Sequence, residues 1–125
     1  MIVLVDARNV LRSRWPNVPE AELVERTGRW ARAQGVRAVL AFDGLGPGGV
    51  AGERDAGDDA VVVGTGAESA DDWIVRRAAE LALRGERYWL VSSDRAVRHA
   101  AGEAAERVVG GGAFVAEIGA ARPRS

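Results

Sequence analysis

Cysteine and lysine are both absent from the 125-residue sequence, and histidine occurs once. Without cysteine the chain can form neither disulfides nor thiolate-zinc sites, and a reducing compartment is permitted, so we expect a cytoplasmic location. The 17 basic residues are all arginine, and 18 acidic residues leave a formal net charge of −1. That balance excludes a protein that binds nucleic acid by overall charge alone, so any contact with a polyanion must be local.

Long hydrophobic runs are also absent. No stretch approaches the ~20 apolar residues that a membrane helix requires, and we expect no membrane association. The N-terminal MIVLVDARN has a short apolar run without a basic leader or a small-residue cleavage site, so we expect no export signal. With 47% hydrophobic and 28% charged residues, the composition suits a packed protein, and we expect residues 1–125 to form a single domain.

Short apolar runs alternate with longer helical patterns along the chain, which is typical of a parallel α/β sheet. Strands are expected at residues 2–5, 36–42, 60–63, 87–92 and 106–109. Helices are expected at residues 19–35, 69–85 and 94–105, the first two ending at glycine. Residues 44–57 are rich in glycine and polar side chains without periodicity, so we expect a loop there.

The stretch AFDGLGPGG, residues 41–49, contains a Gly-x-Gly-x-x-Gly spacing like that of a dinucleotide-binding loop. In such a loop the third glycine opens a helix, whose N-terminal amides hold the pyrophosphate. Here Gly49 leads into VAGERDAGDD, which has no apolar stripe with which a helix could pack. We therefore interpret the glycines as a loop beside a functional site and not as a nucleotide pocket.

Aspartates close three of the expected strands, namely Asp6, Asp43 and Asp94. The carboxyl ends of parallel strands share one edge of a sheet, where ligands bind at the switch in strand order, so these acids are expected to converge. Each alone has a structural explanation, Asp6 and Asp94 as helix N-caps and Asp43 as the start of an Asp-Gly turn. Together they favour a bound cation, because clustered carboxylates raise one another's pKa unless a cation neutralises them.

The motif ESADDWI contributes a further carboxylate. Ser69 and Asp72 form a variant of the capping box, which explains Asp72. Asp71 begins the apolar stripe of the expected helix and should point along the sheet toward the strand-end acids, whereas Glu68 is a weaker candidate. Oxygen ligands with no cysteine and one histidine select Mg²⁺ or Mn²⁺ over zinc, and such ions activate water for phosphodiester cleavage.

Four stretches in order, IVLVDARN, VLAFD, ESADDWI and WLVSSD, resemble the NYN domain of the PIN-like nuclease superfamily, in particular its YacP-like branch. The resemblance extends from residue 2 to about residue 109. It implies a three-layer α/β/α fold with a five-stranded parallel sheet of order 3-2-1-4-5, and a metal-dependent ribonuclease site at the strand ends. The positions that match the family's site are Asp6, Asn9, Asp71 and Asp94, with Asp43 at the strand-two position.

The resulting hypothesis is a Mg²⁺- or Mn²⁺-dependent endoribonuclease that acts on RNA, free or associated with the ribosome. Its metal ligands are Asp6, Asp71 and Asp94, while Asn9 orients a phosphate or water and Asp43 assists. Arg8, Arg54 and Arg95 are expected near the same edge as phosphate contacts, with surface solubility as the simpler explanation of each. Trp15 is a candidate for base stacking or for packing, and Trp30, Trp73 and Trp89 are expected in or near the core.

Two departures from the family pattern leave a second interpretation open. Ala7 stands where the family commonly has glycine, and the chain is short at its C-terminus, so residues 110–125 are expected to pack poorly or to recruit a partner. A non-catalytic RNA- or ribosome-binding module with a degenerate nuclease fold is therefore the alternative. A receiver-like domain or phosphatase on a similar sheet is disfavoured, because a receiver requires a lysine near its last strand.

Overall fold

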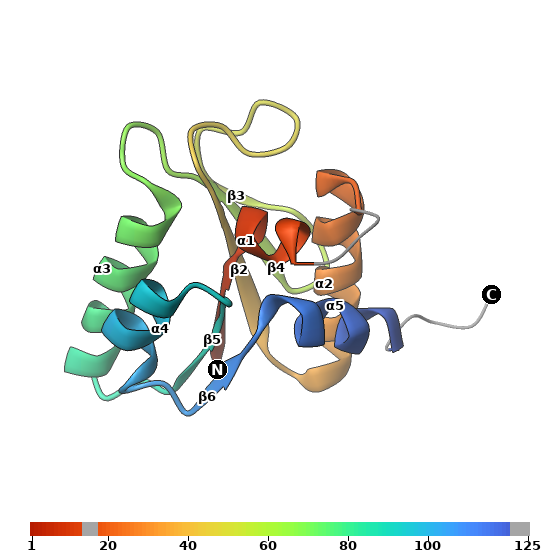
Figure 1. Ribbon diagram of the computed structural model, residues 1–125. Coiled ribbons are helices and arrows are strands. Elements are labelled where there is room, and N and C mark those ends of the chain that lie inside the picture. The colour runs from red at the N-terminus through yellow and green to blue at the C-terminus, as the bar shows by residue number, and fades with distance from the viewer. Residues whose placement is uncertain (14–17, 121–125) are drawn as a thin grey trace.

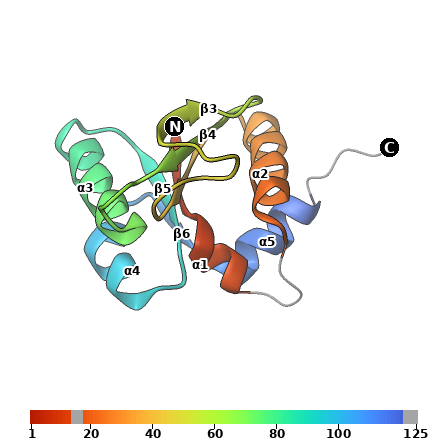
Figure 2. The ribbon, with the colours of Figure 1, turned by 90° about the horizontal axis from the view of Figure 1, so that it is seen from above.

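A computed structural model, which describes residues 1–13 and 18–120, shows a sheet covered by helices on both faces (Figures 1 and 2). The strands are β1 (Ile2–Asp6), β2 (Arg37–Phe42), β3 (Gly52–Asp55), β4 (Ala60–Gly64), β5 (Tyr88–Val91) and β6 (Arg107–Val109). The helices are α1 (Ala7–Arg12), α2 (Glu20–Gln34), α3 (Ala70–Leu83), α4 (Arg95–Gly102) and α5 (Gly111–Ala120). Within these described ranges, no helix combines the length and apolar character needed to cross a bilayer.

The six strands form one sheet in the order β3-β4-β2-β1-β5-β6. Every neighbouring pair is parallel except β3 and β4, which are antiparallel. The expected order 3-2-1-4-5 corresponds to β4-β2-β1-β5-β6 and is confirmed. The prediction of a purely parallel, five-stranded sheet is wrong, because residues 52–55 of the expected loop form the edge strand β3. All four residues of β3 are exposed, so its sequence GERD has no apolar alternation that would mark a strand.

The view from above shows helices on both sides of the sheet (Figure 2). An apolar layer lies between the sheet and the helices on each face. Helices α1, α2 and α5 cover one face, where Trp30, Phe114 and Ile118 are buried. Helices α3 and α4 cover the other face, where Ile74 and Leu81 are buried. The central strands are therefore buried on both faces, which explains why their sequences are continuous apolar runs.

Helix α5 corrects the expectation for the C-terminal segment. Phe114 and Ile118 lie four residues apart on one face of the helix and are each 1% exposed. The Phe114 ring meets Trp30 edge to face with ring centroids 5.1 Å apart, and Trp30 Nε1 donates a 2.9 Å hydrogen bond to Glu117. The prediction that residues 110–125 pack poorly is therefore wrong for residues 111–119, because their apolar side chains have helical spacing.

The glycine-rich segment after β2 folds into a tight turn. The Gly46 amide donates to the Val50 carbonyl at 2.8 Å, and Gly44 forms an isolated antiparallel bridge with Gly66. The chain then continues into β3, so Gly49 opens no helix. The segment lacks the helix N-terminus that a dinucleotide pocket requires, as expected.

Gly64, the last residue of β4, permits the close approach of this turn. A Cβ built at Gly64 would overlap the carbonyl oxygen of Val50 and lie 2.8 Å from that of Gly44. We therefore expect Gly64→Ala to lower the free energy of unfolding by ~2 kcal/mol, as overpacking does. Gly119→Ala is the control, because a Cβ there meets no atom within 4 Å and alanine favours a helix. Equal urea midpoints for wild type and Gly64→Ala would contradict this prediction.

Candidate active site

The carboxyl groups of Asp6 and Asp71 meet at the C-terminal end of β1. Asp6 ends this central strand and is 3% exposed, while Asp71 is half-buried in the first turn of α3. The two groups lie within hydrogen-bonding reach of each other. Two acids that are distant in the sequence are thus brought together, as predicted from the strand-end pattern.

The pKa of Asp6 rises from 3.8 to about 7 in this environment. Burial is the largest cause, followed by the charge of Asp71 and the hydrogen bond between the two carboxyl groups. The backbone of Asn9 and the hydroxyl of Ser92, which lies 3.4 Å from Asp6 Oδ2, act in the opposite direction. Two carboxylates at one site do not both ionise without cost, so the pair either keeps a proton near neutral pH or requires a positive charge.

Hydrogen bonds of Asn9 and Ser93 connect the edge of the site with neighbouring elements. The Asn9 side-chain oxygen accepts a 2.8 Å hydrogen bond from the Ser93 amide, and Ser93 Oγ accepts one of 2.8 Å from the Gly111 amide. These bonds connect α1, the turn after β5 and the start of α5. Asn9 therefore has a structural contact that its sequence position did not reveal, and its predicted role toward phosphate or water remains a prediction.

Asp94 lies at the same edge of the sheet as the pair, but its carboxylate caps a helix. Its Oδ1 accepts a 3.0 Å hydrogen bond from the Val97 amide at the start of α4. Its own amide donates to Ser92 Oγ at 3.1 Å, and that hydroxyl donates to Asp6. Among the residues that the structure describes, no group of three or more acids or histidines is arranged to hold a metal. The N-cap alternative for Asp94 is thus observed, and its metal role remains a prediction.

Asp43 holds the start of α3 in place. Its Oδ1 accepts a 2.8 Å hydrogen bond from the Ala70 amide, in the helical turn that carries Asp71. The backbone carbonyl of Asp43 in turn accepts a 2.9 Å hydrogen bond from Arg8 Nη1. Asp43 therefore acts on the site through the position of α3, a role that sequence analysis missed because Ala70 lies in a distant part of the chain.

Replacing Asp43 tests this capping role. We expect Asp43→Ala to lower the free energy of unfolding by about 1 kcal/mol, because the Ala70 amide loses its acceptor. Asp43→Asn keeps an oxygen in the same position and should retain most of that stability. Urea denaturation of both variants distinguishes the two cases. An equal loss in both would show that the negative charge, and not the hydrogen-bond acceptor, matters.

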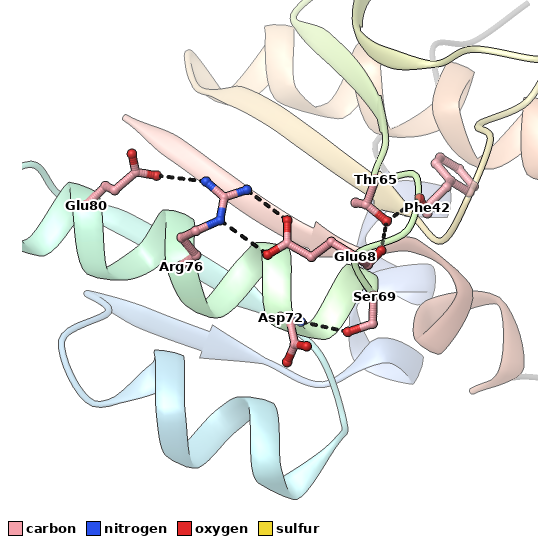
Figure 3. Close-up of polar contacts among 7 residues, drawn as sticks. All are labelled: Phe42, Thr65, Glu68, Ser69, Asp72, Arg76 and Glu80. Atoms are coloured by element: carbon pink, nitrogen blue, oxygen red, sulfur yellow. Dashed lines mark hydrogen bonds and ion pairs between the residues drawn. The ribbon is translucent and has the colours of Figure 1, made fainter.

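Further contacts brace the segment before α3 (Figure 3). Ser69 Oγ accepts a 3.1 Å hydrogen bond from the Asp72 amide, so the predicted Ser69 cap is confirmed. Thr65 Oγ1 donates to the Phe42 and Glu68 carbonyls at 3.2 and 2.6 Å. Glu68 was the weaker candidate for the site. Its carboxylate forms an ion pair with Arg76 at 2.9 Å, so its charge is already paired within the protein.

The sequence profile of the YacP-like NYN domain matches residues 3–124. This chain belongs to the YacP-like NYN family. NYN domains are PIN-like nucleases, so the resemblance recognised from four short motifs is confirmed. No curated protein sequence matches the chain significantly.

Two solved structures show that this NYN domain shares its fold with a bacterial relative. Rae1 (YacP) from Bacillus subtilis is 20% identical with a TM-score of 0.72, and the match covers 97% of this chain and 75% of that chain. The W164L mutant of the same protein gives 19% identity and a TM-score of 0.70, with 96% and 76% coverage. At this level of identity the match establishes the fold alone.

Two of the arginines expected at the strand-end edge of the NYN domain lie there. Arg8 Nη1 and Nη2 donate to the carbonyls of Asp43 and Leu45 at 2.9 and 3.5 Å, and its Nε pairs with Glu20 at 3.3 Å. Arg8 therefore braces the turn after β2. Arg95 is exposed at the first position of α4, beside the strand-end acids. The predicted phosphate contacts of both arginines remain predictions.

Arg54, the third of these arginines, lies in the edge strand β3, and its predicted phosphate contact remains a prediction. Arg54 belongs to β3, where it pairs in register with Val62 of β4. It lines a hollow together with Ile2 and Arg37, the first residues of β1 and β2. Val62 pairs with Leu40, and Leu40 pairs with Val5, so Arg54 is level with the residue before Asp6 but three strands away from it.

The remaining expectations for single residues of this NYN domain have mixed outcomes. Ala7, which replaces the usual glycine, is fully buried as the first residue of α1. Trp30 is buried, while Trp73 and Trp89 are partly buried, as expected. Trp15, the candidate for base stacking, lies outside the described residues.

Proposed function

We propose that this NYN domain is a metal-dependent endoribonuclease that cleaves RNA phosphodiesters at the Asp6–Asp71 pair. Membership of a PIN-like nuclease family supports nuclease activity. The observation that carries the proposal is a buried carboxylate whose pKa rises to about 7 beside a second carboxylate. Capping of α1 does not account for the second carboxylate, because the Asn9 backbone lowers the pKa of Asp6 whereas the neighbouring Asp71 raises it. Such perturbed acids are typical of functional sites.

The Asp6–Asp71 pair fits a hard divalent cation. Both ligands are carboxylates, the chain has no cysteine, and its single histidine, His99, is exposed on α4. Mg²⁺ is commonly held by one or two carboxylates and keeps several waters, so a pair of acids is a sufficient donor set. When bound, such an ion neutralises the two carboxylates and activates water and phosphate for hydrolysis.

The chain's own residues fix the geometry of this pair. Ser92 donates a hydrogen bond to Asp6 Oδ2 and so orients that carboxyl group, which is itself almost fully buried. Asp43 holds the first helical turn that carries Asp71. Asn9 anchors the adjacent turn after β5, where Arg95 is exposed near the phosphates of an approaching RNA. Preorganisation of this kind lowers the cost of aligning a phosphodiester for attack.

A non-catalytic RNA-binding module is the second candidate. One observation favours it: the carboxylate of Asp94 is occupied as the cap of α4, so that, within the described residues, only two of the three proposed metal ligands converge. A degenerate site of this kind would bind RNA, free or on the ribosome, and leave it intact. For either function we propose a cytoplasmic location, which the cysteine-free composition permits.

Incubation with RNA separates the two candidates. The purified protein is mixed with single-stranded and structured RNAs in buffer that contains Mn²⁺, Mg²⁺ or EDTA, and the products are resolved on denaturing gels. The proposal predicts fragments with either metal and intact RNA with EDTA. Intact RNA under all conditions, with binding by filter retention, supports the second candidate. Equal cleavage in EDTA contradicts metal dependence.

A further inference from the structure

Arg8 connects the two acids of the candidate site through a chain of contacts. Its backbone lies two residues after Asp6, at the start of α1. Its side chain reaches the end of β2, where Nη1 donates a 2.9 Å hydrogen bond to the Asp43 carbonyl. The Asp43 carboxylate accepts a 2.8 Å hydrogen bond from the Ala70 amide, and Asp71 is the next residue. Because the carboxyl groups of Asp6 and Asp71 meet, these contacts form a closed ring.

The guanidinium group of Arg8 is held by protein atoms on several sides. Besides the bond from Nη1, Nη2 lies 3.5 Å from the Leu45 carbonyl and Nε pairs with the Glu20 carboxylate at 3.3 Å. The group also lies over the buried Phe42 ring, 6.0 Å from its centroid. Each of its three nitrogens therefore has a protein acceptor. The phosphate contact expected from the sequence would compete with these bonds, whereas a bracing role uses them as they stand.

Sheet pairing ends before it reaches the turn that positions Asp71. Asp6 is the last residue of β1 to pair with β2, whereas Asp43 lies beyond the last residue of β2. On one side the turn is bonded to the segment that leads into α3, through the amides of residues 66 and 70. On its other side it is bonded to α1 through Arg8. The first set of bonds moves with Asp71 and the second with Asp6, so Arg8 acts on the position of one carboxylate relative to the other.

We propose that Arg8 is a positioning residue, which fixes the spacing of the Asp6 and Asp71 carboxylates through Asp43 and not by contact with metal or RNA. The inference rests on the proposed function, in which the pair of acids holds a divalent cation. Two carboxylates repel each other, so the surrounding protein must hold them at the spacing that the cation requires. Residues that orient the ligands of a metal typically change its affinity by about 10- to 100-fold when they are replaced.

The direction of the change in metal affinity separates this role from the effect of charge. Arg8 carries a positive charge near a site for a cation, so removal of that charge alone should strengthen metal binding. Loss of the brace should weaken metal binding. A phosphate contact would leave the metal affinity unchanged or slightly stronger and would lower the affinity for RNA instead. We therefore expect Arg8→Gln to raise the dissociation constant for Mn²⁺ about tenfold in the absence of RNA.

The test is a calorimetric titration of the RNA-free protein with Mn²⁺, in which Asp71→Asn identifies the titrated site. Arg8→Lys keeps the charge, but one ammonium group cannot bond the turn and Glu20 in the fixed geometry of a guanidinium. Its dissociation constant should rise at least about fivefold. Arg12→Gln is the matched control, because it removes the same charge from an exposed position at the end of α1. Its affinity should stay within about twofold of wild type.

A double-mutant cycle with Asp43→Ala tests the route by which Arg8 acts. Asp43→Ala breaks the ring at the Ala70 amide, so adding Arg8→Gln to it should change the dissociation constant for Mn²⁺ less than about twofold. Thermal unfolding checks that each variant folds, and Arg8→Lys carries the same cycle if Arg8→Gln does not fold.

Three results would overturn the inference alone while wild type still binds Mn²⁺: unchanged affinity in both Arg8 variants, tighter binding by Arg8→Gln, or additive effects in the cycle. An equal loss of affinity in Arg12→Gln would overturn it as well. Wild type that binds no Mn²⁺ rejects the metal-dependent function itself, and the inference with it.

Discussion

Asp71→Asn is expected to reduce RNA cleavage on the order of 100-fold or more in kcat/KM while leaving the fold intact. The substitution keeps the size of the side chain and its place in the first turn of α3. It removes one of the two carboxylates that meet at the end of β1 and with it half of the charge available to a divalent cation. Initial rates of cleavage in Mn²⁺, over a range of RNA concentrations, measure the effect.

Asp72→Asn is the control for this substitution. Asp72 follows Asp71 in the same helical turn, is exposed, and contributes its backbone amide to the Ser69 cap. Removing its charge alters the interaction with the helix dipole equally, yet leaves the Asp6–Asp71 pair unchanged. Its activity should stay within twofold of wild type. If both variants lose activity alike, or if Asp71→Asn cuts as well as wild type, the pair is not the catalytic site.

The meeting of Asp6 and Asp71 was predictable because it depends on topology more than on detailed packing. Parallel strands with a right-handed connection bring their carboxyl ends to one edge, and Asp6 ends the central strand. The apolar stripe of α3 fixes which of its residues face the sheet, so Asp71 had to point toward that edge. Both arguments use only the periodicity of apolar residues, which a single sequence contains.

The hydrogen bonds of Asp43 and Asp94 were harder to predict than the meeting of Asp6 and Asp71. Both acids lie at the expected edge, but a carboxylate accepts hydrogen bonds from whichever amide is nearest in space. For Asp94 that amide belongs to Val97, three residues later, so the N-cap alternative could be named from the sequence. For Asp43 the amide belongs to Ala70, and nothing in the local sequence indicates which distant helix begins beside it.

The edge strand and the last helix show a second limit of sequence reasoning. Strand β3 is fully exposed and charged, so it has no apolar pattern and is held by its backbone pairing with β4. Helix α5 begins with glycines, which disfavour helices, but it gains stability from Phe114 packed against Trp30. In both cases the decisive contribution comes from a partner element and not from local propensity.

In metal-free buffer, the free energy of unfolding should fall as the pH rises from about 4 to about 7. The pKa of Asp6 is about 7 in the folded protein and 3.8 in the unfolded chain. The folded protein therefore binds the extra proton in this window, and the slope of stability with pH is negative. The contribution is complete below the unfolded pKa and is lost as the pH rises through the folded one. It amounts to about 4 kcal/mol at most.

Asp6→Asn isolates this contribution from those of the other acids, because asparagine does not titrate. Urea denaturation in EDTA should show wild type losing stability relative to Asp6→Asn between pH 4.5 and pH 8. A difference that is the same at both pH values would mean that the pKa of Asp6 is not raised.

Added Mg²⁺ extends the same argument to function. At pH 8 the desolvation and repulsion that destabilise ionised Asp6 are relieved by a cation, so Mg²⁺ should restore part of the stability of wild type. At a concentration 100 times the dissociation constant the gain is about 2.7 kcal/mol. Asp6→Asn lacks one of the two charges and should gain little. If both proteins respond equally to Mg²⁺, the cation binds elsewhere, and the destabilising pair of acids must be explained without a metal.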